Sequence, residues 1–395
     1  MERPVAWRIE DTRNVAPGMK MAVSFLADGP AAVREWADGV RQDDMELALF
    51  FCAPDFQTQE TAAALREALP GVPVVGCTTA GEITPKGYRN ASLTGLSLRR
   101  ADCVSASRHM TDIRNFHLQN GGKVVDALKA ELAARAAPPT GHNTFALLLV
   151  DELTYVEERV AVSVGSALGD IPLVGGTAGD DWQLKESKVF YDGAFHGNSA
   201  VLTLVQTNLP FQVLSTHHFE PGDERAVITE ADPLRRIVYE INGVPALDEY
   251  ARLCGRPVAQ INRVSASQHP FMVCIGGAQY PRGVVTLRPD KSLEFACAID
   301  KGVVFTIAQP RDPVRHLKDT FATLRKQLGP LALVIGCDCA ARKLLFESQN
   351  IMGDVSQVLV DNKVVGFATM GEQYNTIHMN NSFSCVAIGQ GRAKE

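Results

Sequence analysis

The sequence of 395 residues lacks the features that mark membrane proteins and nucleic-acid-binding proteins. No apolar run is long enough to span a bilayer, and the first residues carry no apolar core of a secretion signal. The formal charge is −6 and the basic residues form no block, which argues against nucleic acid or an anionic membrane as a partner. We therefore expect a cytoplasmic protein.

The sequence also lacks the short motifs that hold phosphates, dinucleotides or covalent haem. No glycine-rich loop runs into a Lys and a Ser or Thr, and the spacing of Gly76 and Gly81 differs from the dinucleotide fingerprint. No Cys-x-x-Cys-His is present, which excludes c-type haem. The nine cysteines are odd in number and several lie in apolar stretches, so we expect free thiols and no disulfides.

What the sequence does contain is a threefold internal repeat. Each copy has an apolar stretch, a helix-length segment, a second apolar stretch ending in a glycine turn, and a last apolar stretch that follows an Asn; the copies span residues 45–100, 143–206 and 329–390. Repetition on this scale indicates duplicated α/β units, because solenoid periods are shorter. Equivalent loops of duplicated units could converge on one site, so the residues after each glycine turn are the first place to look for function.

Between the second and third copies the pattern changes to strand after strand. Short apolar stretches and turns fill residues 188–228 and 271–307, and Pro-Gly and Asp-Pro pairs interrupt residues 220–232. The expected fold class is therefore α/β with two domains. Residues 1–222 would hold two repeat copies, and residues 223–395 would hold the third copy together with a strand-rich insertion. Each part is long enough to bury its own core.

An acidic residue closes each glycine turn, namely Glu82, Asp180 and Glu372. These carboxylates would repel a phosphate group. One interpretation is that the glycines only shape the turns. The other is that the acidic residue binds the amino group of a ligand or a backbone N–H group.

His378 lies in the loop after the third glycine turn and is the main candidate for a ligand contact. His196 occupies nearly the same place in the second copy, and Tyr88 does so in the first. Both residue types can be axial ligands of haem iron. The alternative for each histidine is a surface or hydrogen-bonded side chain.

Several cysteines and histidines give weaker signals. Cys77 would need a nearby base to act as a nucleophile, and sequence alone places none beside it. Cys337 and Cys339 have no second pair at zinc spacing, so we interpret them as loop residues. His217 and His218 are adjacent on an expected strand, so their side chains point to opposite faces and suit one metal poorly.

These motifs together resemble the FIST family of sensory input domains. The N-terminal FIST pattern is similar to residues 75–83 and 172–181, and the C-terminal pattern is similar to residues 244–250 and 269–272 and to Gly371-Glu372. The resemblance covers roughly residues 20–390. Within the family, the stretch from Gly371 to Asn381 is most similar to the nitric-oxide-sensing haem proteins called NosP.

The resemblance implies a sensor and not an enzyme. It implies that the chain binds haem b, responds to nitric oxide, and signals to a separate sensor histidine kinase or cyclic-di-GMP enzyme in a two-component system; a homo-oligomer is compatible with it. His378 is the expected iron ligand, with His196, Met379 and Glu372 in the cofactor site. Nitric oxide would weaken the Fe–His bond and relax the loop that carries His378.

The second hypothesis is a FIST sensor without haem that recognises a small metabolite such as an amino acid. In this case Glu82, Asp180 or Glu372 would pair with the amino group of the metabolite. A third hypothesis is an enzyme with Cys77 as its nucleophile. An optical spectrum separates the first two, because haem gives a Soret band.

Overall fold

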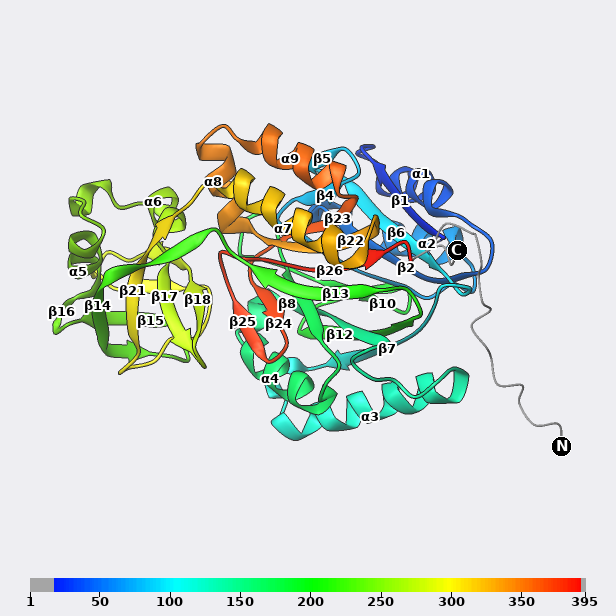
Figure 1. Ribbon diagram of the computed structural model, residues 1–395, viewed down its shortest axis with the longest axis horizontal. Coiled ribbons are helices and arrows are strands. Elements are labelled where there is room, and N and C mark those ends of the chain that lie inside the picture. Colours follow the sequence, from blue (N-terminus) through cyan, green and yellow to red (C-terminus); the bar gives the residue numbers. More distant parts are fainter. Residues whose placement is uncertain (1–17, 392–395) are drawn as a thin grey trace.

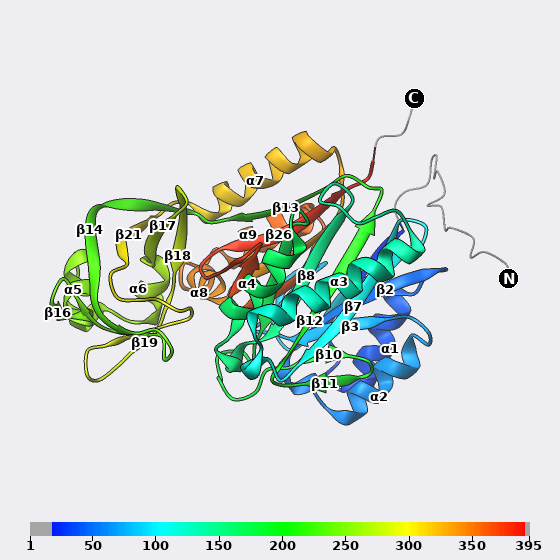
Figure 2. The same cartoon turned by 90° about the horizontal axis from the view of Figure 1, so that it is seen from below.

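The computed structural model describes residues 18–391, which form a core of three repeats and an inserted strand-rich unit beside it (Figures 1 and 2). The mixed α/β architecture agrees with the expected fold class. No helix within the described residues is long and apolar enough to cross a bilayer.

The first repeat consists of β1 (Met19–Ser24), α1 (Gly29–Val40), β2 (Met45–Cys52), α2 (Gln59–Ala68), β3 (Val74–Thr78), β4 (Glu82–Thr84), β5 (Gly87–Arg89) and β6 (Leu93–Arg99). The second consists of β7 (Cys103–Thr111), α3 (Leu118–Arg135), β8 (Thr144–Asp151), α4 (Glu157–Leu168), β9 (Leu173–Ala178), β10 (Val189–Tyr191), β11 (Ala194–His196) and β12 (Ser199–Thr207). The third consists of β13 (Phe211–Thr216), α7 (Pro313–Leu328), β22 (Leu331–Cys339), α8 (Ala340–Ser348), α9 (Met352–Asp361), β23 (Val364–Thr369), β24 (Glu372–Tyr374), β25 (Ile377–Met379) and β26 (Phe383–Gly389).

The three repeats build their sheets with the same strand order. The orders are β1-β6-β2-β3, β7-β12-β8-β9 and β13-β26-β22-β23, and in each sheet the last two strands are parallel while the others pair antiparallel. This agreement confirms the internal duplication. It also adds a strand and a helix to the front of each copy that the sequence repeat did not include.

The chain leaves its own sheet at each glycine turn and forms a short hairpin on the sheet of another repeat. Hairpin β4–β5 extends the third sheet through β23, β10–β11 extends the first sheet through β3, and β24–β25 extends the second sheet through β9. The three hairpins are thus exchanged in a closed cycle. The segments after the glycine turns, which we expected to be loops, are therefore hairpins. They dock at three separate places and not at one shared site.

A glycine of each repeat lies in a strand at the point where the incoming hairpin pairs. These are Gly76, Gly175 and Gly366, opposite Phe190, Gln373 and Ile83 respectively. A Cβ atom at any of them would lie within 2.5 Å of a backbone oxygen of the neighbouring parallel strand. The glycines therefore allow close strand approach.

The inner faces of the three sheets pack against one another, and the helices cover the outer faces. Leu49, Leu147 and Ile335 belong to the shared inner core, in which Phe51 and Phe367 stack with ring centroids 4.7 Å apart. Phe51 comes from the first repeat and Phe367 from the third, and the inner core as a whole contains side chains of all three repeats.

The inserted unit separates β13 from α7 in the third repeat. It contains β14 (Phe219–Asp232), β15 (Ile237–Ile241), β16 (Val244–Pro245), α5 (Ala246–Leu253), α6 (Arg263–Gln268), β17 (Phe271–Ile275), β18 (Ala278–Arg282), β19 (Val284–Leu287), β20 (Leu293–Phe295) and β21 (Val304–Pro310). Its own core surrounds Phe271, which stacks on Phe305 with centroids 4.0 Å apart. The expected boundary between residues 222 and 223 falls inside β14, and the third repeat begins before it, at β13.

Candidate functional site

Glu82 and Glu372 hold the end of each hairpin to the start of the following strand. One carboxylate oxygen of Glu82 accepts from the amide and the hydroxyl of Ser92, and Glu372 makes the same pair of bonds with Ser382. Burial raises the pKa of Glu82 to about 7 and that of Glu372 well above its usual value. These two acids close the exchanged hairpins. The second carboxyl oxygen of Glu372, Oε1, has no hydrogen-bond partner among residues 18–391.

Asp180 has a different role from the other two turn acids. Its carboxylate accepts from the backbone N–H groups of Leu184, Lys185 and Glu186, in the loop before β10. It orders a loop that the other two copies do not have. The second copy therefore departs from the repeat at this turn.

The hairpin register corrects the equivalence expected for His196. Gln373 lies opposite His378 in the third hairpin, Ile83 lies opposite Tyr88 in the first, and Phe190 lies opposite Phe195 in the second. The residue equivalent to His378 is therefore Phe195. His196 lies one position further on, with its Nε2 3.1 Å from the Tyr191 carbonyl oxygen and its ring 4.3 Å from that of His109.

His378 is buried where the third hairpin meets the inserted unit. Its Nδ1 lies 3.0 Å from Gln373 Nε2, and its Nε2 lies 3.5 Å from the carbonyl oxygen of Ala296. Because the Gln373 amide donates to Nδ1, the network assigns the ring proton to Nε2, facing Ala296. Burial lowers the pKa of His378 to about 4, so the ring is neutral at pH 7.

Arg236 connects the inserted unit to the second repeat by buried ion pairs. Its guanidinium donates to Glu157 and, over 2.8 Å, to Glu158 at the start of α4, and also to Ala296 within the inserted unit. Glu158 accepts from the amide of Ala298 as well, over 2.6 Å. Burial raises the pKa of Glu157 to about 7, although Arg236 opposes this shift.

A second arginine completes this contact. Arg282, at the end of β18, donates to the carbonyl oxygen of His378 over 2.6 Å. We call this contact the junction; its side chains are Glu157, Glu158, Arg236, Arg282 and His378. It joins three parts of the chain, namely the inserted unit, α4 of the second repeat and the hairpin of the third repeat.

Some acceptor oxygens in and beside the junction have no hydrogen-bond donor among residues 18–391. They include Glu152 Oε2, Glu157 Oε1, Asn380 Oδ1 and Asn381 Oδ1. Burial, and next the charge of Glu157, raise the pKa of Glu152 well above its usual value. Buried polar atoms without hydrogen-bond partners are costly, so these oxygens are unusual features of this part of the protein.

The arrangement around His378 does not fit a haem ligated by this residue. Both ring nitrogens face polar atoms of the protein, and a Cβ atom on Gly371 would lie only 2.2 Å from the ring. The sulfur of Met379 accepts from the Ser215 hydroxyl over 3.2 Å, and Glu372 is bonded to Ser382. Iron ligation by His378 would require these contacts to separate.

The cysteines that sequence reasoning selected lie inside the protein. All nine cysteines are free, and Cys77, Cys337 and Cys339 are buried, which raises the pKa of each thiol well above its usual value. No group of three or more His, Cys, Asp or Glu side chains that could hold a metal occurs in this part of the chain. His217 faces the Gln279 carbonyl and His218 faces Arg342, so the two rings have different partners.

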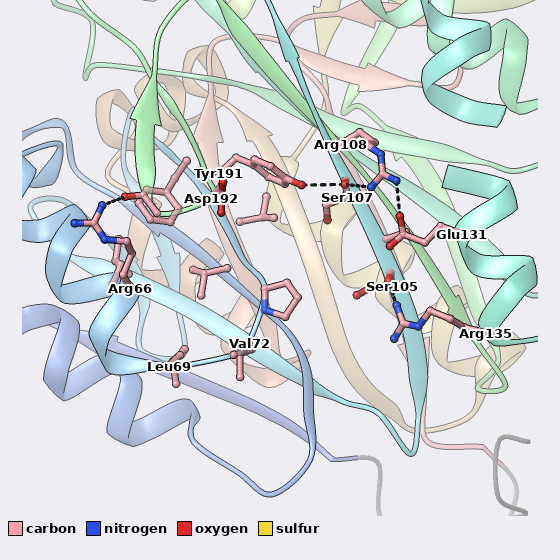
Figure 3. A pocket seen from close by; sticks show the side chains of 18 residues that line it. Arg66, Leu69, Val72, Ser105, Ser107, Arg108, Glu131, Arg135, Tyr191 and Asp192 are labelled. Carbon is pink, nitrogen blue, oxygen red and sulfur yellow. Dashed lines mark hydrogen bonds and ion pairs between the residues drawn. The ribbon is translucent and has the colours of Figure 1, made fainter. Parts of the chain in front are cut away.

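A cavity of about 400 Å³ lies between the first and second repeats, and its lining includes none of the candidate site residues that sequence reasoning selected (Figure 3). It is bounded by α2, the loop before β3, β7, α3 and the turn of the β10–β11 hairpin. Its lining residues are spread over four separate stretches of the sequence, within residues 65–75, 105–108, 131–135 and 190–193. No single motif could have pointed to it.

Comparison with known proteins finds two family models that match consecutive parts of the chain. Residues 46–244 match the FIST N domain and residues 246–375 match the FIST C domain. The chain is also similar to "Uncharacterized protein MJ1623" of Methanocaldococcus jannaschii, at 25% identity over 191 residues, which is 48% of this chain and 36% of that protein. FIST domains are sensory domains of signal transduction proteins. The chain therefore belongs to the FIST family.

Proposed function

We propose that this FIST protein senses a small molecule with an amino group, which binds at the junction and is reported to a separate partner. Support comes from one observation, the buried oxygens of Glu152 and Glu157 that have no donor among residues 18–391. An ammonium group carries three N–H donors and a positive charge, so it complements two neighbouring carboxylates.

The charges at this place favour a cation. The three acids Glu152, Glu157 and Glu158 outnumber the two arginines of the junction, Arg236 and Arg282, and the neutral ring of His378 adds no positive charge. Burial raises the pKa of Glu152 and of Glu157, and a bound cation would favour the ionised form of both. The amino group thus pairs with Glu152 and Glu157 in this proposal. The sequence suggested the turn acids Glu82, Asp180 or Glu372 for that role. Glu82 and Glu372 are bonded to serines and Asp180 to backbone amides, and of these three acids only Glu372 keeps a buried oxygen without a partner among residues 18–391.

The junction is also where a ligand could change the position of the inserted unit. Binding pockets are common between domains, and a ligand shifts a conformational equilibrium only if it binds one state better than the other. A ligand that competes with Arg236 for Glu157 does this directly. The partner in this proposal is a sensor histidine kinase or a cyclic-di-GMP enzyme, whose activity should change when the two proteins are mixed.

Thermal unfolding with a panel of amino acids and simple amines tests the proposal. A ligand at one hundred times its dissociation constant stabilises the folded state by about 2.7 kcal/mol. We expect this shift in the wild type and in Glu67→Gln, an exposed control, and its loss in Glu152→Gln. Equal shifts in Glu152→Gln and the wild type would reject the amine site.

Haem b with nitric oxide as the signal is the second candidate, supported by the resemblance of residues 371–381 to NosP. Reconstitution with haemin tests it in the same preparations, because bound haem shifts the Soret band. If His378 holds the iron, His378→Ala loses the shifted band, and added imidazole restores it. A Soret band that stays unchanged on mixing wild-type protein with haemin would leave the amine sensor as the function.

A further inference from the structure

The cavity between the first two repeats combines apolar side chains with arginines on two opposite sides. Leu69, Val72 and Phe190 form the apolar part. Arg66 reaches it from α2, and Arg108 and Arg135 reach it from β7 and α3 on the opposite side (Figure 3). Its volume of about 400 Å³ lies within the range of cavities that enclose small organic ligands.

Two of these arginines already bind carboxylates, which indicates the chemistry they select. Arg108 donates to Glu131 over 2.5 Å, and Arg135 donates to the buried Glu46 over 2.6 Å. Each guanidinium has five N–H donors, and each of these two side chains uses only two of its nitrogens in the hydrogen bonds of the structure. Donors therefore remain for an incoming anion.

The side chains that line the cavity include three arginines and two acids, Glu131 and Asp192, so the lining carries one more positive than negative charge. The hydroxyl of Tyr191 donates to the Ser107 carbonyl oxygen over 3.2 Å, and Arg135 donates to the Ser105 carbonyl oxygen over 2.7 Å. Both of these carbonyl oxygens of β7 therefore already accept a hydrogen bond from a side chain. Glu131 lies at the rim, where it competes with any ligand for Arg108.

We infer that this cavity is a second ligand site, which takes an organic carboxylate with an apolar body. The carboxylate pairs with Arg108 and Arg135, and the apolar body lies against Leu69, Val72 and Phe190. This inference does not rest on the amine site at the junction, because the two sites share no residue and select opposite charges.

Calorimetric titration of the full chain with octanoate, and with octylamine as the charge-reversed probe, tests the site. We expect octanoate to bind and octylamine not to bind. Arg135→Gln should weaken octanoate at least about tenfold, since it removes a charge-assisted bond. Arg100→Gln is the matched control, because Arg100 also pairs with Glu46 over 3.0 Å but does not line the cavity.

Two further variants keep the test decisive if Arg135→Gln fails to fold. Val72→Asp puts a negative charge into the cavity from a loop and should abolish octanoate binding. Glu131→Gln removes the competing carboxylate and should tighten binding. Equal affinity for octanoate and octylamine, equal losses in Arg135→Gln and Arg100→Gln, or no octanoate binding by the wild type would each overturn the inference.

Discussion

The docking sites of the second and third hairpins have the same backbone geometry and opposite chemistry. Phe195 of the second hairpin packs among aromatic rings, with centroids 5.0 Å from Phe190 and 6.1 Å from Phe50. His378 of the third hairpin is equivalent to Phe195 but lies beside Glu158 and the inserted unit. Both sites close the core, but only the site of the third hairpin also contacts the inserted unit.

The difference separates stability from coupling. Aromatic burial is favourable without requiring a particular partner, whereas a buried ion pair rarely adds net stability and fails when one partner is removed. The polar site therefore depends on the position of the inserted unit, and the aromatic site does not. This dependence is what a sensor needs at the contact that transmits its signal.

The largest expected effect comes from removing Arg236. Arg236→Met leaves Glu157 and Glu158 buried without their cation and should lower the free energy of unfolding by about 3–5 kcal/mol. Urea denaturation measures the loss. The double variant Arg236→Met with Glu157→Gln should recover part of it, and no recovery would mean that the ion pair is not the cause.

The pH dependence of stability should distinguish the polar site next. The folded pKa of His378, about 4, lies below its ordinary value of 6.5, so between these values the unfolded state binds more protons. The contribution of His378 is therefore present above pH 6.5 and is lost as pH falls toward 4, on the order of 3 kcal/mol in total.

Comparison with His378→Gln isolates this contribution. Glu157 has the opposite dependence, because its pKa is raised from 4.5 to about 7 and its contribution is lost as pH rises through that window. Glu157 is unchanged in the variant, so its effect cancels in the difference. A wild-type minus variant difference that does not change between pH 4 and 6.5 would contradict the neutral, buried His378.

At the aromatic site, Phe195→Ala should cost about 2 kcal/mol, less than a fully buried phenylalanine, because Phe195 is partly exposed. The loss should be the same from pH 4 to 7, since no titratable group is removed. Denaturation at several pH values measures it. A marked pH dependence would show that the two docking sites are less distinct than their contacts suggest.

The smallest effect tests what the hairpins share. Ser92→Ala and Ser382→Ala each remove a hydroxyl that donates to the carboxyl group closing a hairpin. Because burial raises the pKa of both acids, each loss should be that of an ordinary hydrogen bond, about 0.5–1.5 kcal/mol. We expect the two losses to agree within error in urea denaturation. Unequal losses would show that the inserted unit also affects the closing carboxylate of the third hairpin.

Sequence reasoning found the repeats because their apolar stretches and glycine turns recur in the same order. It could not find the exchange of hairpins, because strands of three residues carry almost no periodic signal and a sequence repeat does not say which sheet a hairpin joins. Counting back from Asn198 placed His196 one position away from the true equivalent, Phe195. The neighbours of His378 come from residues 157–158, 236, 282 and 296, which no local pattern links to it.

The exchange of hairpins fixes the order in which the sheets can be completed during synthesis. The first hairpin emerges early but joins the sheet of the third repeat, which does not yet exist. The second sheet keeps the edge of β9 open until residues 372–379 have been made, almost at the end of the described chain. An open strand edge invites pairing with other chains. Nascent chains stopped before residue 372 should therefore aggregate, even though the first sheet has already received its hairpin.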